Sequence, residues 1–180
     1  MLDESLKTQL KAYLERLVNP IELVASVDDS AASAEMMALL NDIVAQNGKI
    51  SLREDNVANV RKPSFAVNRI GEDTGVRFAG LPMGHEFTSL VLALLQVSGY
   101  PPKVEADVIE QIKNLQGDFN FEVYISLSCH NCPDVVQTLN QIALIHGNFH
   151  HEIIDGGYVP EEISSLSIQG VPSLIVGQKL

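Results

Sequence analysis

The two cysteines of this chain, Cys129 and Cys132, are separated by two residues, and Pro133 follows them at the start of a predicted helix. A pair at this spacing can close a small disulfide ring at a helix N-terminus, where backbone N–H groups and the helix dipole favour a thiolate. By position, Cys129 is the expected attacking thiolate and Cys132 is expected to resolve the mixed disulfide. His130 either stabilises the thiolate when protonated or is an exposed spacer. The pattern indicates redox chemistry.

A zinc site is the first alternative, because the spacing Cys129-x2-Cys132-x13-His146-x3-His150 satisfies a zinc-finger rule. Residues 133–145, however, carry the apolar period of a single helix. At a rise of 1.5 Å per residue, this helix would hold His146 roughly 20 Å from the cysteines. Zinc needs all of its ligands within about 2.3 Å of the metal, so helix geometry argues against a metal site.

Unreactive core cysteines are the second alternative, and the polar neighbours of the pair argue against it. Ser128, His130 and Asn131 describe an exposed loop and not a packed interior. Beyond the helix, we expect His150 and His151 to be surface or strand-edge histidines without assigned chemistry.

The composition excludes several classes of partner. The 180 residues are 46% hydrophobic and 19% charged, with a formal net charge of −11 and no run of Lys and Arg, which argues against nucleic acid or an anionic membrane as partner. The longest apolar run, Leu90–Leu95, is far shorter than the ~20 residues of a membrane-spanning helix. The N-terminus lacks the features of a signal peptide, so we expect a reducing, cytoplasmic setting.

Helical and strand-like periods alternate along the chain, which predicts an α/β fold. Residues 98–102 are rich in Gly and Pro and predict a turn or linker between two series of elements. The expected helices cover residues 6–17, 31–46, 86–97, 107–115 and 133–145, and the expected strands cover 21–27, 49–53, 63–67, 76–79, 119–127 and 149–154.

The two series share short sequence matches in the same order. Glu22–Ser26 aligns with Glu122–Ser126, and Lys62–Val67 aligns with Val171–Val176. The larger offset of the second match is consistent with a loop insertion around 156–165. We interpret this as a duplication, with one subdomain at 1–101 and a second, which carries the dithiol, at 102–180.

A β-α-β unit followed by a strand that begins at proline is typical of a thioredoxin-like subdomain. In that fold the proline is in cis and faces the dithiol, and Pro63 and Pro172 fit its position in the two copies. Asp29 stands roughly where Cys129 stands, so the first copy is expected to be redox-silent. The second copy reaches Gln178–Leu180 before the last strand and helix that the fold calls for, so we expect it to be truncated, as part of a longer protein.

The second subdomain departs from thioredoxin at two positions beside the dithiol. Thioredoxins carry a buried Asp about six residues before the first cysteine, where this chain has Val123, and a Trp where it has Ser128. Either the acid is dispensed with or another part of the chain supplies it.

Five segments carry a specific resemblance. They are Ser126–Asp134, Gly84–Leu95, Arg61–Phe65, Arg77–Gly80 and Asp155–Gly157. Together they closely resemble the N-terminal domain of the flavoprotein component of bacterial alkyl hydroperoxide reductases, over essentially the whole chain.

The resemblance implies a relay that passes electrons from NADH and FAD, in a C-terminal flavoprotein body outside this chain, to the disulfide of a peroxiredoxin. Peroxides, alkyl and hydrogen, would then be reduced by that partner, and the full-length protein would be a homodimer. It also implies that Glu86 stands near the cysteine pair and replaces the acid missing at Val123. A carboxylate in the first turn of a helix can equally be a simple dipole partner. No glycine-rich phosphate loop occurs in this chain, so no cofactor site is expected here.

Two other function classes fit the same residues. A stand-alone protein disulfide oxidoreductase with tandem thioredoxin-like units would share the fold and the dithiol but act on many substrates. A non-catalytic interaction module would use the two units as a platform, and its cysteines would not cycle.

Overall fold

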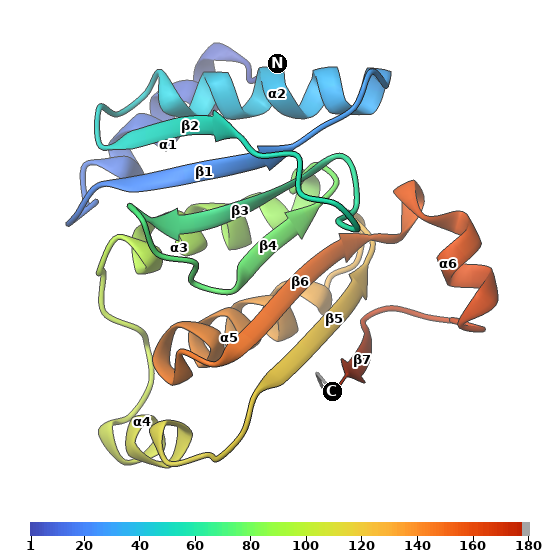
Figure 1. Cartoon of the computed structure of the whole chain (residues 1–180). Coiled ribbons are helices and arrows are strands. Elements are labelled where there is room, and N and C mark those ends of the chain that lie inside the picture. Colours follow the sequence, from blue (N-terminus) through green and yellow to red (C-terminus); the bar gives the residue numbers. More distant parts are fainter. Residues whose placement is uncertain (178–180) are drawn as a thin grey trace.

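One mixed sheet of seven strands runs through the chain, in the order β2-β1-β3-β4-β6-β5-β7 (Figure 1). The computed structural model describes residues 1–177. The helices are α1 (Glu4–Leu14), α2 (Ala31–Val44), η1 (Gly84–Glu86), α3 (Phe87–Val97), α4 (Ala106–Lys113), α5 (Cys132–His146), η2 (Gly156–Tyr158) and α6 (Pro160–Ser165). The strands are β1 (Ile21–Ser26), β2 (Ile50–Glu54), β3 (Ser64–Arg69), β4 (Val76–Ala79), β5 (Phe119–Ile125), β6 (Phe149–Asp155) and β7 (Ser173–Gly177).

The predicted repeat of elements is present. In the first half β1 is parallel to β2 and antiparallel to β3, and in the second half β5 is parallel to β6 and antiparallel to β7. The Lys62–Pro63 and Val171–Pro172 peptide bonds are both cis and directly precede β3 and β7. The two prolines therefore occupy equivalent places in the two halves, while the boundary between residues 101 and 102 stays a prediction.

Local hydrogen bonds set the ends of the helices. Of the two capping candidates for α1, Asp3 is the one used, because its carboxylate accepts from the backbone N–H of Leu6 at 2.7 Å. The helix ends at Leu14, earlier than the apolar period predicted.

The expected loop insertion at 156–165 is partly wrong, because this segment contains η2 and α6. Pro160 begins α6, and proline is favourable in the first turn of a helix.

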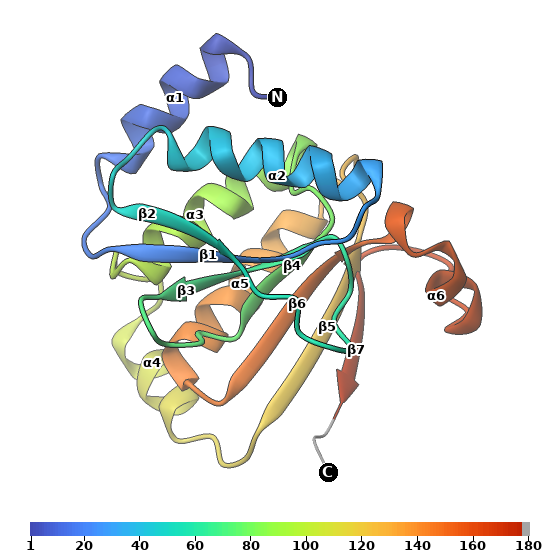
Figure 2. The ribbon, with the colours of Figure 1, turned by 45° about the horizontal axis from the view of Figure 1, so that its top comes forward.

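Helices α2, α3 and α5 cover one face of the sheet (Figure 2), and their apolar side chains form a shared core with alternate residues of the strands. The opposite face carries a smaller apolar cluster around Tyr124 and Ile154, and beside it a hollow of about 540 Å³ with a mixed polar and apolar lining. Among the described residues, no helix is both long and apolar enough to cross a membrane.

The two halves join edge to edge. Strand β4 pairs in parallel with β6, from Val76 opposite His151 to Ala79 opposite Ile154, and α3 packs against α5 over this seam. The pairing corrects one prediction: His151 is neither at the surface nor at a strand edge. It is 1% exposed, and its Nδ1 lies 2.8 Å from the Oδ1 atom of Asn140 on α5. Burial lowers the pKa of His151 to about 3.

Strand β7 is the last element of the described chain and lies at the edge of the sheet. Leu174 and Val176 on this strand are 43% and 58% exposed, whereas Phe65 and Val67, at the equivalent places on β3, are fully buried. No counterpart of β4 or α3 follows β7 within residues 1–177. The expected truncation concerns Gln178–Leu180, which lie outside the described residues.

Candidate active site

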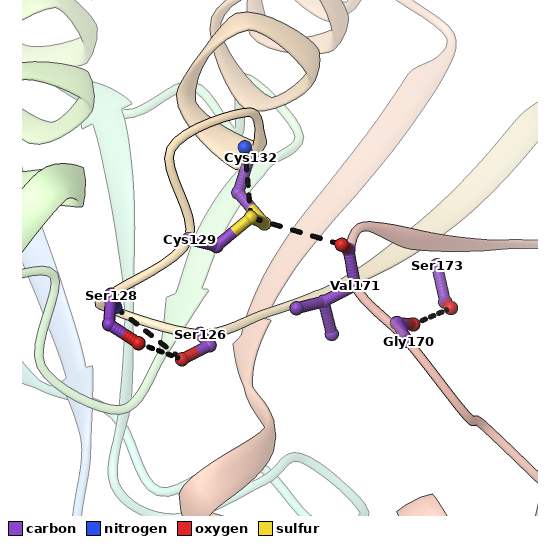
Figure 3. The surroundings of a disulfide bond; sticks show 7 residues. All are labelled: Ser126, Ser128, Cys129, Cys132, Gly170, Val171 and Ser173. Atoms are coloured by element: carbon purple, nitrogen blue, oxygen red, sulfur yellow. Dashed lines mark hydrogen bonds between the residues drawn. A yellow bond between two sulfur atoms is a disulfide. The ribbon is translucent and has the colours of Figure 1, made fainter.

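The cysteine pair lies in the loop between β5 and α5 and forms a disulfide, with the two Cα atoms 5.5 Å apart (Figure 3). The loop folds back on itself because the N–H of Cys129 donates to the carbonyl of Ser126 at 3.0 Å. Asn131 gives α5 no side-chain cap. Instead the backbone N–H of Cys132 donates to the Cys129 sulfur at 3.2 Å. Cys129 thus occupies the place of a helix cap, where a thiolate would be stabilised.

The two sulfurs differ in exposure as predicted. Cys132 is fully buried in the first turn of α5, while Cys129 is partly exposed. The residues around them, Ser128, His130 and Asn131, are all exposed. A partner sulfur can therefore approach Cys129 but not Cys132.

Pro172 directly follows the residue that contacts the dithiol, and its own role stays a prediction. The carbonyl oxygen of Val171, the residue on the other side of the cis bond, lies 3.9 Å from the Cys129 sulfur (Figure 3). The adjoining turn is closed by the Ser173 hydroxyl, which donates to the carbonyl of Gly170 at 2.5 Å. This places partly exposed backbone next to the accessible sulfur.

The short helix η1, which belongs to the first half of the chain, docks on the dithiol loop. The N–H of His85 donates to the carbonyl of Leu127 at 3.0 Å, and the rings of His85 and His130 lie with their centroids 4.4 Å apart. Gly84 permits this contact: its φ is +56°, and a Cβ atom there would lie 2.7 Å from the Leu127 oxygen. The first half of the chain, which has no cysteine, thus contributes a wall to the site.

Glu86 lies at the end of η1 and is fully buried. Neither of its carboxylate oxygens has a hydrogen-bond partner among the described residues. Burial raises the pKa of this carboxyl above its ordinary value, and the nearby Ser89 hydroxyl opposes that rise in part. Glu86 and Leu127 line the same small crevice, so the carboxyl lies beside the loop that carries the cysteines. Its role, like that of His130, stays a prediction.

The single helix that was predicted between the cysteines and His146, and that argues against a zinc site, is present. Helix α5 is continuous from Cys132 to His146, and the His146 ring lies against the carbonyl of Leu115 at 2.8 Å. Within residues 1–177, no group of three or more His, Cys, Asp or Glu side chains is arranged to hold a metal ion.

The sequence and the fold of the chain were compared with those of known proteins. No protein-family model matches the chain. Over 174 residues it is 58% identical to the F subunit of alkyl hydroperoxide reductase in Pseudomonas aeruginosa, covering 97% of this chain and 33% of that protein. It superposes with a TM-score of 0.89 on the N-terminal domain of the Enterococcus faecalis F subunit, at 28% identity, covering 100% of this chain and 96% of that domain.

By sequence and fold, the chain belongs with the N-terminal domains of the alkyl hydroperoxide reductase F subunits. It spans about a third of the length of the curated relatives it matches. A protein disulfide oxidoreductase from Aeropyrum pernix has the same fold, with a TM-score of 0.82 and 23% identity, over 98% of this chain and 85% of that one. The predicted α/β fold of two tandem thioredoxin-like units is confirmed.

Two residues near the dithiol were missed by sequence reasoning. His85 contacts His130, and Asp155 lines the crevice of Glu86. Each belongs to a segment that carried the resemblance, Gly84–Leu95 and Asp155–Gly157. A systematic reading of the polar residues in those segments would have found both.

Proposed function

We propose that this domain is a dithiol relay, which receives electrons from a flavoprotein body of the same polypeptide and passes them to the disulfide of a peroxiredoxin. The observation that carries the proposal is the Cys129–Cys132 disulfide, with one accessible and one buried sulfur, beside the cis peptide bond of Pro172. Thiol exchange requires this asymmetry, because one sulfur must meet the partner and the other must release it.

The exchange proceeds in two displacements. In the reduced domain, the Cys129 thiolate attacks one sulfur of the partner disulfide, so that a mixed disulfide forms and the other partner sulfur leaves as a thiolate. Cys132 then loses its proton and attacks the Cys129 sulfur, which restores the intramolecular disulfide and releases the second partner thiolate. Two electrons pass from the domain to the partner, and solvent supplies the protons of the partner thiols.

Glu86 is the proposed proton acceptor for Cys132. Val123 cannot serve, and Glu86 is a buried carboxyl next to Leu127, two residues before Cys129. A buried carboxyl whose pKa is raised above its ordinary value is a better proton acceptor for a thiol than an exposed one. His130, paired with His85, is proposed to stabilise the Cys129 thiolate when protonated.

The wider context of the relay is part of the same proposal. The relatives are named as the F subunit of alkyl hydroperoxide reductase and, for a Bacillus subtilis relative at 49% identity, as NADH dehydrogenase, and these names support NADH as the electron source. FAD and NADH would bind in the flavoprotein body, since this chain has no dinucleotide-binding loop. The whole protein would be a cytoplasmic homodimer that reduces a peroxiredoxin and so supports peroxide removal.

Trapping of the mixed disulfide tests the relay. Cys129→Ser should abolish reduction of an oxidised two-cysteine peroxiredoxin, because the attacking sulfur is lost. Cys132→Ser should accumulate a covalent adduct with the peroxiredoxin, seen as a shifted band on a non-reducing gel that collapses with dithiothreitol. An adduct with Cys129→Ser alone would reverse the assignment of the two sulfurs.

Substrate choice separates this relay from the other two classes. The wild-type reduced domain should reduce the peroxiredoxin disulfide much faster than the disulfides of insulin. Equal rates would favour a general protein disulfide oxidoreductase. Cysteines that stay disulfide-bonded during turnover with either substrate would favour an interaction module.

The Glu86→Gln variant tests the proton acceptor. An amide of the same size cannot take the proton from Cys132, so the second displacement should slow by roughly 10- to 100-fold at neutral pH. The free energy of unfolding should stay unchanged or rise, because a buried carboxylate without hydrogen bonds destabilises the fold above its raised pKa. Denaturant unfolding and stopped-flow exchange measure the two effects. An unchanged exchange rate would leave Glu86 with a structural role alone.

A further inference from the structure

The turn before the cis-proline is built alike in the two halves of the chain. In the second half the Ser173 hydroxyl donates to the carbonyl of Gly170 at 2.5 Å, and in the first half the Ser64 hydroxyl donates to the carbonyl of Arg61 at 2.5 Å. Arg61 and Gly170 therefore occupy equivalent places, two residues before each cis-proline. The first half thus has a long cationic side chain where the second half has a glycine.

The Arg61 guanidinium reaches from the first half to helix α6 of the second. Its Nε atom donates to both carboxylate oxygens of Glu162, at 3.1 and 3.0 Å, and its Nη2 atom donates to Oε1 at 2.5 Å. The Tyr124 hydroxyl donates to the same Oε1 atom at 2.8 Å. A carboxylate that accepts from the planar fork of an arginine and from a second donor is fixed in direction as well as in distance.

Helix α6 has little else to attach it to the sheet. It projects beyond the sheet between β6 and β7 (Figure 1), and none of its residues is buried. Ile163 packs against the small apolar cluster around Tyr124 and Ile154. Within residues 1–177, Glu162 makes the only ion pair of α6. Glu162 and Ile163 are thus the residues that attach this helix to the rest of the protein.

The segment 166–171 connects α6 to the cis-proline beside the dithiol. All of its residues except Ile168 are exposed. Its start is tied to α6, because the N–H of Leu166 donates to the carbonyl of Glu162 at 3.0 Å and the N–H of Ile168 donates to that of Ile163 at 3.0 Å. A movement of α6 would therefore move this segment.

The end of the segment lies where a partner must approach. The Val171 carbonyl is 3.9 Å from the Cys129 sulfur, and Gly170 and Val171 are exposed beside it (Figure 3). Pairing of β7 with β5 begins only at Ser173, so it fixes the chain after this backbone and not before it. Exposed backbone of this kind binds an extended partner chain through main-chain hydrogen bonds.

We propose that Arg61 and Glu162 are positioning residues for the exchange reaction. Their ion pair holds α6 so that the backbone of Gly170 and Val171 is placed to receive the partner chain that carries the disulfide. The proposal rests on the proposed relay to a peroxiredoxin. It concerns the binding of a protein partner and not the reactivity of Cys129, because the guanidinium and the carboxylate bind each other and not the dithiol.

The Glu162→Ala variant tests this role. Alanine is favourable in a helix, so α6 should still form but lose its ion pair. The reduced chain is mixed with increasing excesses of an oxidised two-cysteine peroxiredoxin, and its loss of free thiols is followed by quenching with an alkylating reagent. We expect the half-saturating peroxiredoxin concentration to rise by roughly 2- to 10-fold, as for the loss of about one hydrogen bond, with an unchanged maximal rate.

A small aromatic disulfide serves as the comparison substrate. It has no chain to bind the exposed backbone, so its reaction with the thiolate of Cys129 should proceed at the wild-type rate in Glu162→Ala. A purely structural role would not produce this split between the two substrates. Equal slowing with both would indicate damage to the dithiol loop and would overturn the proposal.

Two further variants control for charge. Glu161→Ala removes the same charge from the same helix, but Glu161 is exposed and makes no ion pair within residues 1–177. Glu122→Gln removes a different carboxylate partner of Arg61, one that lies on β5, so α6 stays attached. Both should keep the wild-type half-saturating concentration. A rise in either control equal to that in Glu162→Ala would make net charge the cause and overturn the proposal.

Hydrogen exchange tests the attachment without a partner. Backbone amides of residues 164–172, measured by mass spectrometry, should exchange faster in Glu162→Ala than in the wild type. Unchanged exchange, or faster exchange with an unchanged half-saturating concentration, would overturn the positioning role and leave the relay intact. A wild-type chain that reduces the aromatic disulfide but not the peroxiredoxin would instead overturn the relay, and this role with it.

Discussion

The loops that precede α2 and α5 are equivalent in the repeat but are held by different residues. In the second half a disulfide fixes the loop. In the first half the Asp28 carboxylate accepts hydrogen bonds from the backbone N–H of Ser30 and from the hydroxyls of Ser30 and Ser33. Ser30 in turn caps α2 by accepting from the N–H of Ser33 at 3.1 Å. The loop of the first half, which has no cysteine, is thus organised by one carboxylate and two hydroxyls.

This arrangement predicts a stability change that depends on pH. Hydrogen bonds from Ser30 and Ser33 lower the pKa of Asp28 to about 2. Because the folded pKa is below the unfolded value, the stabilisation is fully present above about pH 4 and is lost as pH falls toward 2. Asp28→Asn should therefore be less stable than wild type at neutral pH and equal to it near pH 2, measured by urea unfolding.

Asp29→Asn is the matched control, because the neighbouring carboxylate makes no hydrogen bond to the described residues and is exposed. Its stability should follow wild type at every pH. A deficit of the same size in both variants would mean that loop charge, and not the hydrogen bonds of Asp28, is responsible.

The site residues that could be predicted from the sequence are those recognisable from their type and from their immediate neighbours along the chain. The two-residue gap between Cys129 and Cys132 and the placement of Pro172 before a strand are visible without a structure. The contact of His85 with His130 and the shared crevice of Glu86 and Asp155 depend on how separate segments dock, which spacing along the chain does not report.

At the scale of elements, the predicted helices and strands are present with ends shifted by a few residues, because hydrogen bonds and not hydrophobic period decide where a helix stops. Helix η1 shows this well. Its apolar neighbours predicted a helix from residue 86, yet a separate turn at 84–86 precedes α3 and contacts the dithiol loop.

Docking of η1 predicts a strong effect of Gly84→Ala. The added Cβ atom would lie 2.7 Å from the Leu127 backbone oxygen, at a positive φ, so η1 must move away from the loop. We expect a loss of about 1–3 kcal/mol in the free energy of unfolding. We also expect a slower second displacement, in which Cys132 attacks the Cys129 sulfur and releases the partner thiolate. Gly48→Ala, where nothing lies within 4 Å, is the control and should change neither quantity. Wild-type exchange in Gly84→Ala would show that η1 does not shape the site.

At the scale of the molecule, the join between the halves was beyond sequence reasoning. The duplication predicted two units, but it did not predict that β4 would pair with β6. The residue pattern of a strand at the edge of a sheet does not indicate which other strand it will pair with. The exposed side of the seam is held by Arg61, which precedes β3 and forms ion pairs with Glu122, Glu152 and Glu162 of the second half. Glu162 also accepts from the Tyr124 hydroxyl at 2.8 Å.

One guanidinium therefore offsets the mutual repulsion of three carboxylates. Burial opposes the charge of Arg61, but its hydrogen bonds and charge contacts with Glu162, Glu152 and Glu122 outweigh burial and raise its pKa. In return, the hydrogen bonds of Arg61 lower the pKa of Glu162. Removing Arg61 would leave the three acids unpaired across the seam.

Arg61→Met should consequently lower the free energy of unfolding by about 2–3 kcal/mol at neutral pH, less than for a fully buried pair because the partners keep 17–33% exposure. The deficit should be present above the ordinary pKa of a glutamate and shrink as pH falls through the lowered pKa of Glu162. Arg53→Met, which removes an exposed pairing with Glu22 within the first half, is the control and should have little effect. Denaturant unfolding at neutral and acidic pH measures both variants. A deficit in Arg61→Met that does not change with pH would point to lost packing and not to charge as the force that holds this face of the seam.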